Sequence, residues 1–406
     1  MTPAARLQAA SEILDAVIAS AREDGPPADT LVTRYFKTRR YAGSKDRRAV
    51  RELVFRAIRR TAERPASGRA AILGLAEDDP ELVGLFGEPR GPGPIGEGDE
   101  GTVPLRGTVP DDVGTVPQRG TVPRWLAAEL SPVVEEGEWP ALLERAPLDL
   151  RVNSARSSRD ALLAEFPEAV LTPLSPWGLR LPPDRRIDDH PTFRSGLVEV
   201  QDEGSQLIAL ACEPRNGERL LDLCAGAGGK ALALAAAAPE AAILATDSNR
   251  ARLSKLPPRA ERAGAKIETR LLNPPHELDE LADWRGTADL VLVDAPCSGS
   301  GTWRRNPEGR WRLTPERLDR LVAAQARLLD IAAEQVGPGG RLVYAVCSLL
   351  SREGAEQTSG FLSRHSAWHV QETPVAAGRL EGAGRLLTPG HDGTDGFFVA
   401  RLARPC

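Results

Sequence analysis

The sequence predicts an α/β fold in which a doubly wound parallel sheet follows a small α/β subdomain and an all-helical N-terminal region. From residue 217 onward, short apolar runs of strand length alternate with helical patterns, which is typical of a parallel sheet covered by helices. In the first 60 residues, apolar side chains recur at helical spacing instead. The chain has 406 residues, enough for about two or three domains.

We expect residues 1–85 to form the helical domain. Residues 5–22 have an apolar helical face (Leu7, Ile13, Leu14, Val17 and Ile18), and Ser44 precedes a second such face (Val50, Leu53, Val54, Ala57 and Ile58). The polar face of the second helix presents Arg47, Arg48, Arg51, Arg56, Arg59 and Arg60. Residues 34–64 contain 12 Lys and Arg against three acidic residues, so this face is either an RNA-binding surface or an ordinary solvated one.

Residues 86–122 have the composition of a linker. Gly and Pro dominate there, and Gly-Thr-Val-Pro recurs at 101, 107, 114 and 120, which predicts an extended segment without a packed core. For residues 123–205 we expect a small α/β subdomain with strands at 148–153, 169–174 and 178–181 and a helix at 158–166. Modules of this kind often hold RNA against an open sheet, which is an analogy at the level of the fold.

Residues 206–406 are predicted to form the doubly wound domain. Five strands stand out, at 219–224, 242–247, 266–272, 289–294 and 340–347. An antiparallel strand at 396–402 is expected to close the edge of the sheet.

The composition predicts a cytoplasmic protein with reduced thiols. The five cysteines lack the spacing of zinc ligands, the first twenty residues lack the pattern of a signal peptide, and the longest apolar run, 231–238, is too short for a bilayer. We therefore expect no metal and no membrane. The formal net charge of −5 argues weakly against a nucleic-acid partner, but the basic segment at 34–64 shows that the charge is unevenly distributed.

A glycine-rich turn follows the first strand of the doubly wound domain. Its residues Cys224, Ala225, Gly226, Gly228, Gly229 and Lys230 are predicted to approach a cofactor at a helix N-terminus, although tight structural turns also use glycine. Asp247 ends the second strand, where it can accept both ribose hydroxyls of a nucleoside cofactor or can cap the helix that begins near Asn249. Asn273 ends the third strand and either contacts an adenine edge or forms the turn before Pro274.

Two cysteines follow neighbouring strands of this sheet. Cys297 lies in Asp294-Ala-Pro-Cys-Ser-Gly and Cys347 in Tyr344-Ala-Val-Cys-Ser. Because ligands bind beyond the carboxyl ends of such strands, both thiols are expected to face one pocket. A thiolate is well suited to add to C6 of a pyrimidine, and Asp294 can hold the amino group or N3 of cytosine. The pair therefore predicts methylation of cytosine at C5.

The segment 303–311, Trp-Arg-Arg-Asn-Pro-Glu-Gly-Arg-Trp, interleaves arginines with two tryptophans. Such a pattern is suited to stacking on bases and gripping phosphates, and packing of one tryptophan in the core is the alternative.

Together these motifs resemble the RsmB/NOP/NSUN family of RNA cytosine-5 methyltransferases over residues 123–406. The family has a Cys-Ala-x-Pro-Gly-Gly-Lys cofactor loop, an Asp-Ala-Pro-Cys-Ser-Gly motif and a Thr-Cys-Ser motif. The resemblance implies a class I, Rossmann-like methyltransferase fold that uses S-adenosyl-L-methionine. It also implies that Cys347 is the nucleophile, that Cys297 assists release, and that Lys230 and Asp294 belong to the catalytic set.

The N-terminal helices, in particular Gly43-Ser-Lys-Asp-Arg-Arg, resemble the NusB-like RNA-binding domain of bacterial family members that act on 16S ribosomal RNA. This pairing implies 16S rRNA as the partner, and we expect a monomer. Three other functions remain open: a transfer-RNA methyltransferase with the same residues, a DNA methyltransferase in which the Pro-Cys thiol is the nucleophile, and a non-catalytic ribosome assembly factor that binds RNA through the basic helix.

Overall fold

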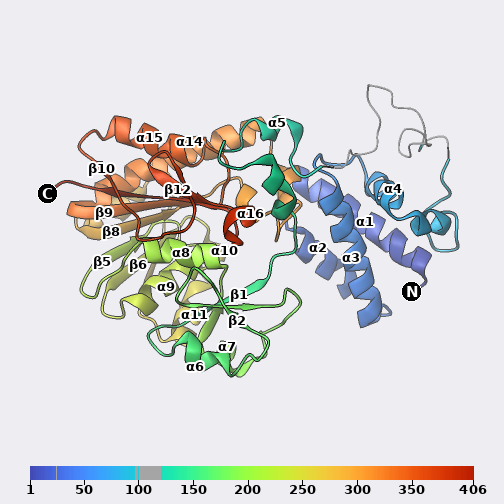
Figure 1. Cartoon of the computed structure of the whole chain (residues 1–406), viewed down its shortest axis with the longest axis horizontal. Coiled ribbons are helices and arrows are strands. Elements are labelled where there is room, and N and C mark those ends of the chain that lie inside the picture. The colour runs from blue at the N-terminus through green and yellow to red at the C-terminus, as the bar shows by residue number, and fades with distance from the viewer. Residues whose placement is uncertain (24, 97–98, 100–119) are drawn as a thin grey trace. The chain divides into compact units, whose positions relative to one another are not determined.

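The computed structural model describes residues 1–23, 25–96, 99 and 120–406 (Figure 1). These residues form two compact units. The helical unit comprises Met1–Glu129, Trp139–Glu144 and Trp303–Thr314, and the sheet unit comprises Leu130–Glu138, Arg145–Thr302 and Pro315–Cys406. Most of the predicted linker at 86–122, including the first three Gly-Thr-Val-Pro repeats, lies outside the described residues.

The helical unit has two more long helices than the sequence patterns indicated. Its helices are α1 (Pro3–Arg22), α2 (Ala28–Lys37), α3 (Ser44–Arg60), α4 (Gly68–Asp78), α5 (Arg124–Ala127) and α13 (Gly309–Arg312), with the 3-10 helix η1 (Pro80–Leu85). The predicted apolar faces of α1 and α3 pack together with α2 and α4 in one core. Gly68 permits the close packing of α4 on α1, because a Cβ there would lie 2.0 Å from the Ser11 carbonyl oxygen. Gly43, and not Ser44, is the N-cap of α3.

Trp303–Thr314 belongs to the helical unit, although its neighbours in sequence belong to the sheet unit. Trp311 is 2% exposed in the core of the helical unit, and its indole nitrogen donates to the Thr61 carbonyl oxygen (3.2 Å). Trp303 and Arg310 are each 1% exposed, and the Arg310 guanidinium donates to backbone carbonyls that include that of Ile58. The prediction that these tryptophans stack on bases is therefore wrong, because both rings are buried inside the protein.

The sheet unit begins with the predicted small subdomain. Its four antiparallel strands follow the order β2-β3-β1-β4 and are β1 (Leu148–Val152), β2 (Val170–Leu171), β3 (Gly178–Leu181) and β4 (Val198–Val200), with helices α6 (Arg159–Leu163) and α7 (Pro191–Arg194). β2 is shorter than predicted, and β4 gave too short an apolar pattern to be recognised. Leu150, Leu179 and Val198 lie in the buried core under this sheet.

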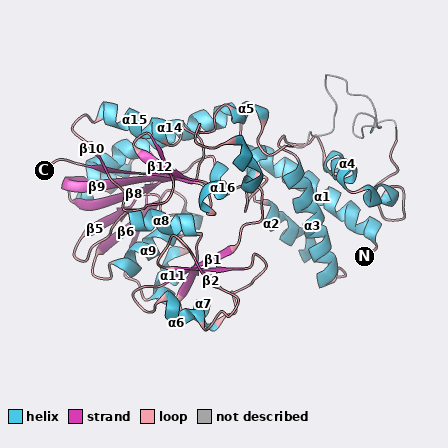
Figure 2. Ribbon diagram, in the orientation of Figure 1, coloured by secondary structure: helices cyan, strands magenta, loops and turns pink. Residues whose placement is uncertain are grey.

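The second sheet is the predicted doubly wound sheet, in the order β11-β12-β13-β9-β8-β5-β6-β7 with β10 beside β13 (Figure 2). Its strands are β5 (Arg219–Asp222), β6 (Ala242–Asp247), β7 (Glu268–Leu271), β8 (Ala288–Asp294), β9 (Val336–Val346), β10 (His369–Gln371), β11 (Arg379–Glu381), β12 (Gly384–Leu387) and β13 (Phe397–Ala403). β5 to β9 are parallel, and β13 is antiparallel to β9. β13 does not close the edge as predicted, because β10 and the β11–β12 hairpin pair beyond it.

Helices cover both faces of this sheet. Figure 1 shows α8, α9 and α11 on one face and α14 and α15 on the other. The helices of this part are α8 (Glu203–Ala211), α9 (Gly229–Ala237), α10 (Arg250–Leu253), α11 (Leu256–Ala263), α12 (Glu277–Glu280), α14 (Pro315–Gln335), α15 (Ala355–Arg364) and α16 (Pro389–Asp392). Because helices bury both faces of the sheet, the central strands have apolar side chains on both sides and appear in the sequence as continuous apolar runs. Every helix in the described part of the chain is too short or too polar to span a lipid bilayer.

Candidate active site

The candidate site residues lie where the order of the parallel strands reverses. From β5 the chain moves outward to β6 and β7, then returns to β8 on the other side of β5. In an open α/β sheet, this switch point leaves a crevice beyond the carboxyl ends of the strands, where ligands bind. The glycine-rich turn follows β5, Asp294 ends β8, and Cys347 follows β9.

The glycine-rich turn has the backbone geometry of a ligand-binding loop. Gly226 and Gly228 have φ angles of +57° and +83°, which L side chains rarely adopt, and Gly228 is the N-cap of α9. Asp247 accepts hydrogen bonds from the backbone nitrogens of Gly226 (2.8 Å) and Asn249 (2.6 Å). The side chain of Asp247 therefore fixes the turn in position at the end of the neighbouring strand.

The structure shows whether Asp247 caps a helix and whether Asn273 forms a turn. Asp247 does not cap the following helix, because Asn249 is the N-cap of α10 and its side chain accepts from the Arg252 nitrogen. Asn273 does form a turn: its carbonyl oxygen accepts from the His276 nitrogen (2.8 Å), and its side-chain nitrogen donates to Glu280 (2.7 Å). A contact between Asn273 and an adenine stays a prediction.

Asp222, at the end of β5, is a candidate that the sequence patterns missed. Its side chain is 1% exposed, and neither carboxylate oxygen has a hydrogen-bond partner within the described part of the chain. Burial, aided by the nearby Asp294 carboxylate, raises the pKa of Asp222 to about 7. The available signal was an acidic residue just before a glycine-rich turn, but the sequence analysis placed it inside the predicted strand 219–224.

Lys230 and Asp294 form an ion pair across the switch point. Lys230 Nζ lies 2.7 Å from Asp294 Oδ2, and Lys230 is only 8% exposed. Burial by itself lowers the pKa of Lys230, but the charge and hydrogen bond of Asp294 outweigh burial and raise this pKa overall. The pair places a fixed cation and an anion, the latter partly open to solvent, beside the thiols.

The structure brings the two cysteine sulfurs together. Cys297 Sγ and Cys347 Sγ are 3.3 Å apart, and both side chains are only partly exposed. Their strands are paired in parallel, with Asp294 beside Ala345, so the two loops that follow emerge at the same edge. The hydrogen bond with Cys347, followed by burial, raises the pKa of Cys297 well above its ordinary value.

The other predicted loop residues lie around this centre. The Ala225 nitrogen donates to the Thr246 carbonyl oxygen, and the Gly229 carbonyl oxygen accepts from Arg151. The sulfur of Cys224 lies in this turn, and burial raises its pKa. No group of three or more His, Cys, Asp or Glu side chains with the arrangement of a metal site occurs in the described ranges.

Comparisons with known proteins agree on the family. A family model described as 16S rRNA methyltransferase RsmB/F matches residues 209–403. The Ribosomal RNA small subunit methyltransferase B of Klebsiella pneumoniae is 35% identical over 293 residues, which are 69% of this chain and 65% of that protein. The chain thus matches somewhat less than two thirds of the length of this curated relative.

Solved structures match the fold. The crystal structure of PH0851 aligns with a TM-score of 0.74 and 21% identity over 99% of both chains. NSun6 from Pyrococcus horikoshii, solved with SFG, aligns with a TM-score of 0.62 and 19% identity over 70% of this chain and 98% of that one. The second sheet is accordingly a Rossmann-like methyltransferase sheet, preceded by a small antiparallel sheet and a helical region. On the sequence match, the chain belongs to the RsmB/F family of methyltransferases.

Proposed function

We propose that this protein transfers the methyl group of S-adenosylmethionine to C5 of a cytosine in 16S ribosomal RNA. The observation that carries the proposal is the convergence of two thiols, 3.3 Å apart, beside the Lys230–Asp294 pair at the switch point of a methyltransferase sheet. The substrate follows from the name of the relatives, Ribosomal RNA small subunit methyltransferase B.

The residues around the glycine-rich turn fit this cofactor. Asp222 is a buried carboxylate without a hydrogen-bond partner in the described chain, and an ammonium group such as that of the methionine part would provide one. Asp247 lies at the second strand end, where an acidic side chain accepts ribose hydroxyls. When bound, S-adenosylmethionine supplies an electrophilic methyl group.

The protein's own groups account for the remaining chemistry. The Cys347 sulfur forms a bond to C6 of a cytosine turned out of its stack, which makes C5 electron-rich. Asp294, held by Lys230, accepts a hydrogen bond from the cytosine amino group. After C5 has gained the methyl group, Cys297 removes the C5 proton, and the electron pair of that C–H bond re-forms the C5–C6 double bond while the bond from C6 to Cys347 breaks.

The coupling of the two thiols gives these steps an order. While Cys347 carries a thiol or thiolate, its hydrogen bond and charge hold the pKa of Cys297 high. Bonding of the Cys347 sulfur to C6 removes that charge, because a thioether is neutral. The pKa of Cys297 therefore falls, so that its thiolate, the form that can accept the C5 proton, is more populated at the stage where that proton must leave.

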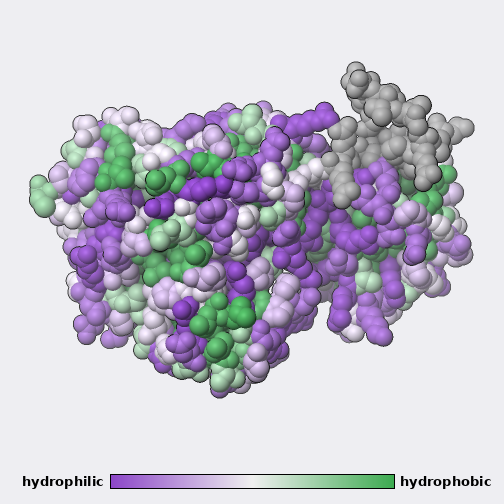
Figure 3. Space-filling model, in the orientation of Figure 1, coloured by the Kyte–Doolittle hydropathy of each residue, from purple (hydrophilic) through white to green (hydrophobic). Residues whose placement is uncertain are grey.

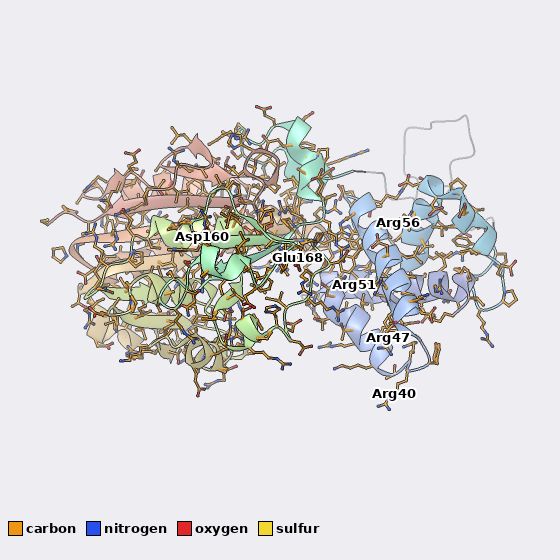
Figure 4. The ribbon with its side chains drawn as sticks, turned by 60° about the horizontal axis from the view of Figure 1, so that its bottom comes forward. Arg40, Arg47, Arg51, Arg56, Asp160 and Glu168 are labelled. Carbon is orange, nitrogen blue, oxygen red and sulfur yellow. The ribbon has the colours of Figure 1, made fainter. Side chains whose placement is uncertain are left out.

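The basic surface that this proposal needs lies at one end of the helical unit. Arg51, Arg56 and Arg60 form ion pairs with acidic residues of the same unit. Near the start of α3, six exposed cations have no ion pair within the described residues: Arg34, Lys37, Arg40, Lys45, Arg47 and Arg48. Figure 4 shows Arg40 and Arg47 at this end, followed by Arg51 and Arg56, and Figure 3 shows the end in hydrophilic colours. We assign RNA phosphate binding to this unpaired end of the basic face.

A methyl-transfer assay with labelled S-adenosylmethionine and 16S rRNA tests the proposal. Cys347→Ala should abolish transfer, whereas Cys297→Ala should accumulate a covalent protein–RNA adduct. Cys406→Ser, which changes an exposed cysteine, is the matched control and should behave as wild type. An adduct in Cys347→Ala would exchange the two roles, and methylation of DNA by Cys347→Ala would favour a DNA enzyme.

The RNA surface has its own test. Replacing Arg40 and Arg48 by Glu should weaken RNA binding and reduce the slope of log affinity against log salt by about one per lost phosphate contact. Replacing the ion-paired Arg56 by Gln is the control. An unchanged salt slope in the double variant would contradict the assignment. Mapping methylated cytosines in RNA from cells with and without the gene separates ribosomal from transfer RNA.

A further inference from the structure

The two cysteine loops are joined by a buried cluster of polar side chains that the chemistry above does not use. Its centre is Glu353, which is 0% exposed and lies between β9 and α15. Gln325 on α14 and Ser300 and Ser348 in the loops are also 0% exposed. A buried carboxylate is costly for the folded protein, and apolar residues of similar volume are often at least as stable. The cluster therefore calls for a reason other than stability.

Glu353 contacts the backbone beside Cys297. Its Oε1 atom accepts from the Ser298 nitrogen (2.8 Å) and from Gln325 Nε2 (2.9 Å). Gln325 Nε2 also donates to the carbonyl oxygen of Pro296 (3.0 Å). The peptide groups on both sides of Cys297 are thus held by one pair of buried side chains, through hydrogen bonds to the backbone.

The other oxygen of Glu353 contacts the loop of Cys347. Ser348 Oγ donates to Glu353 Oε2 (2.5 Å) and lies 3.2 Å from both Ser298 Oγ and Ser300 Oγ. Ser300 Oγ in turn accepts from the Leu349 nitrogen (2.8 Å). Glu353 accepts three hydrogen bonds through its side chain and donates none, which suits an ionised carboxylate. One carboxylate thereby joins the residue after Cys297 to the residue after Cys347.

We propose that Glu353 is a positioning residue, which, with Gln325 and Ser348, holds the two loops so that the sulfurs of Cys297 and Cys347 converge. This inference rests on the proposed function for its purpose, because both sulfurs must reach one pyrimidine ring. Its geometric content, the dependence of the sulfur–sulfur distance on Glu353, is independent of any reaction. Catalytic groups need such supporting contacts, since a displacement of roughly 1 Å costs about a hundredfold in rate.

The negative charge of Glu353 has a second, measurable effect. After the hydrogen bond and charge of Cys347 and the effect of burial, this charge further raises the pKa of Cys297. Removing the charge while keeping the shape should lower that pKa. The pH dependence of thiol reactivity therefore reports on Glu353 in a way that a purely structural contact would not.

The test measures how fast diamide joins the two thiols. In this reaction diamide accepts two electrons and the two thiol protons, and a disulfide forms between the sulfurs; mass spectrometry of the linked peptides gives its rate. Wild type should cross-link rapidly. Glu353→Ala should cross-link at least about tenfold more slowly, because the loops of Cys297 and Cys347 are then no longer held close together. Glu353→Gln should cross-link with a pH profile displaced to lower pH.

The same cross-linking assay is applied to a control variant. Glu356→Gln changes an exposed carboxylate on α15 and should match wild type. Thermal unfolding establishes that each variant is folded. A folded Glu353→Ala that cross-links as wild type does overturns the proposal; if that variant does not fold, Gln325→Ala takes its place, with the same criterion. Neither RNA nor cofactor is present, so a wild-type protein that fails to methylate RNA would refute the proposed function alone.

Discussion

Asp222 should make the stability of the cofactor-free protein fall as the pH rises. The folded pKa of about 7 lies above the value near 4 of an unfolded Asp, so the folded state binds the proton more tightly. The stability due to this proton is present at low pH and is lost as the pH rises through 7. Between pH 5 and pH 8.5 the unfolded carboxyl is ionised throughout, whereas the folded one ionises only above about pH 7. The unfolding free energy therefore falls over the two pH units from 5 to 7, at about 1.4 kcal/mol per unit, which gives a loss of about 3 kcal/mol.

Asp222→Asn should remove this pH dependence. The amide cannot ionise, so this site causes no loss of stability in the variant. From pH 5 to pH 8.5, the unfolding free energy of the variant should therefore rise by about 3 kcal/mol relative to that of wild type. Urea denaturation at the two pH values measures it. Any constant cost of burying the amide cancels in the comparison. Asp188→Asn, an exposed carboxylate in the same unit, should show no such change.

Asp222→Asn should be unfavourable for cofactor binding, although it is favourable for stability at high pH. If Asp222 receives the ammonium group of S-adenosylmethionine, Asp222→Asn should weaken binding in calorimetry by about 1.5 to 3 kcal/mol, the usual range for a hydrogen bond to a charged group. A variant that gains stability at pH 8.5 and loses affinity would support both parts of the reasoning. Equal pH dependence in variant and wild type would refute the assignment of a raised pKa, and unchanged affinity would refute the ammonium contact.

Three further predictions concern other parts of the chain. Trp311→Ala should destabilise the helical unit by about 3 to 5 kcal/mol in urea denaturation, as for large buried aromatics; a loss below 1 kcal/mol would contradict the observed burial. Gly301→Ala would place a Cβ 2.0 Å from the Gly396 carbonyl oxygen, so its thermal midpoint should fall clearly below that of Gly137→Ala, which meets nothing within 4 Å; equal midpoints would count against this. Lys230→Met should slow single-turnover methyl transfer by about a hundredfold or more, because Asp294 loses its fixed cation; full activity would exclude Lys230 from the catalytic set.

The sequence was most informative in the segments where a buried strand is followed directly by the residues of the candidate site. The parallel strands β5, β6, β8 and β9 read as apolar runs because helices cover both of their faces, and the residues that follow them carry the recognisable motifs. The convergence of Cys297 and Cys347 followed from that topology alone, since parallel strands end at the same edge. The small strand β4 and the helix α2 were missed because three or ten residues give too little periodicity to separate from a loop.

Tertiary contacts account for the features that local patterns could not show. The tryptophans of 303–311 looked like base-stacking groups because only the fold reveals that this segment is buried in the helical unit. Asp222 was overlooked because a lone acidic residue at a strand end has no distinguishing spacing. The role of Glu353 depends on hydrogen bonds to residues 28 and 55 positions away, which no local pattern records.

The placement of Trp303–Thr314 restricts how this protein can be divided. A version shortened to begin after the helical region would keep these twelve residues, because they stand between β8 and α14, but would lack the core in which Trp311 and Arg310 are buried. Both side chains would then face water directly downstream of the Cys297 loop. Removal of the first hundred residues therefore also affects this segment, and exchange of the helical region between relatives would have to include Trp303–Thr314 as a matched part.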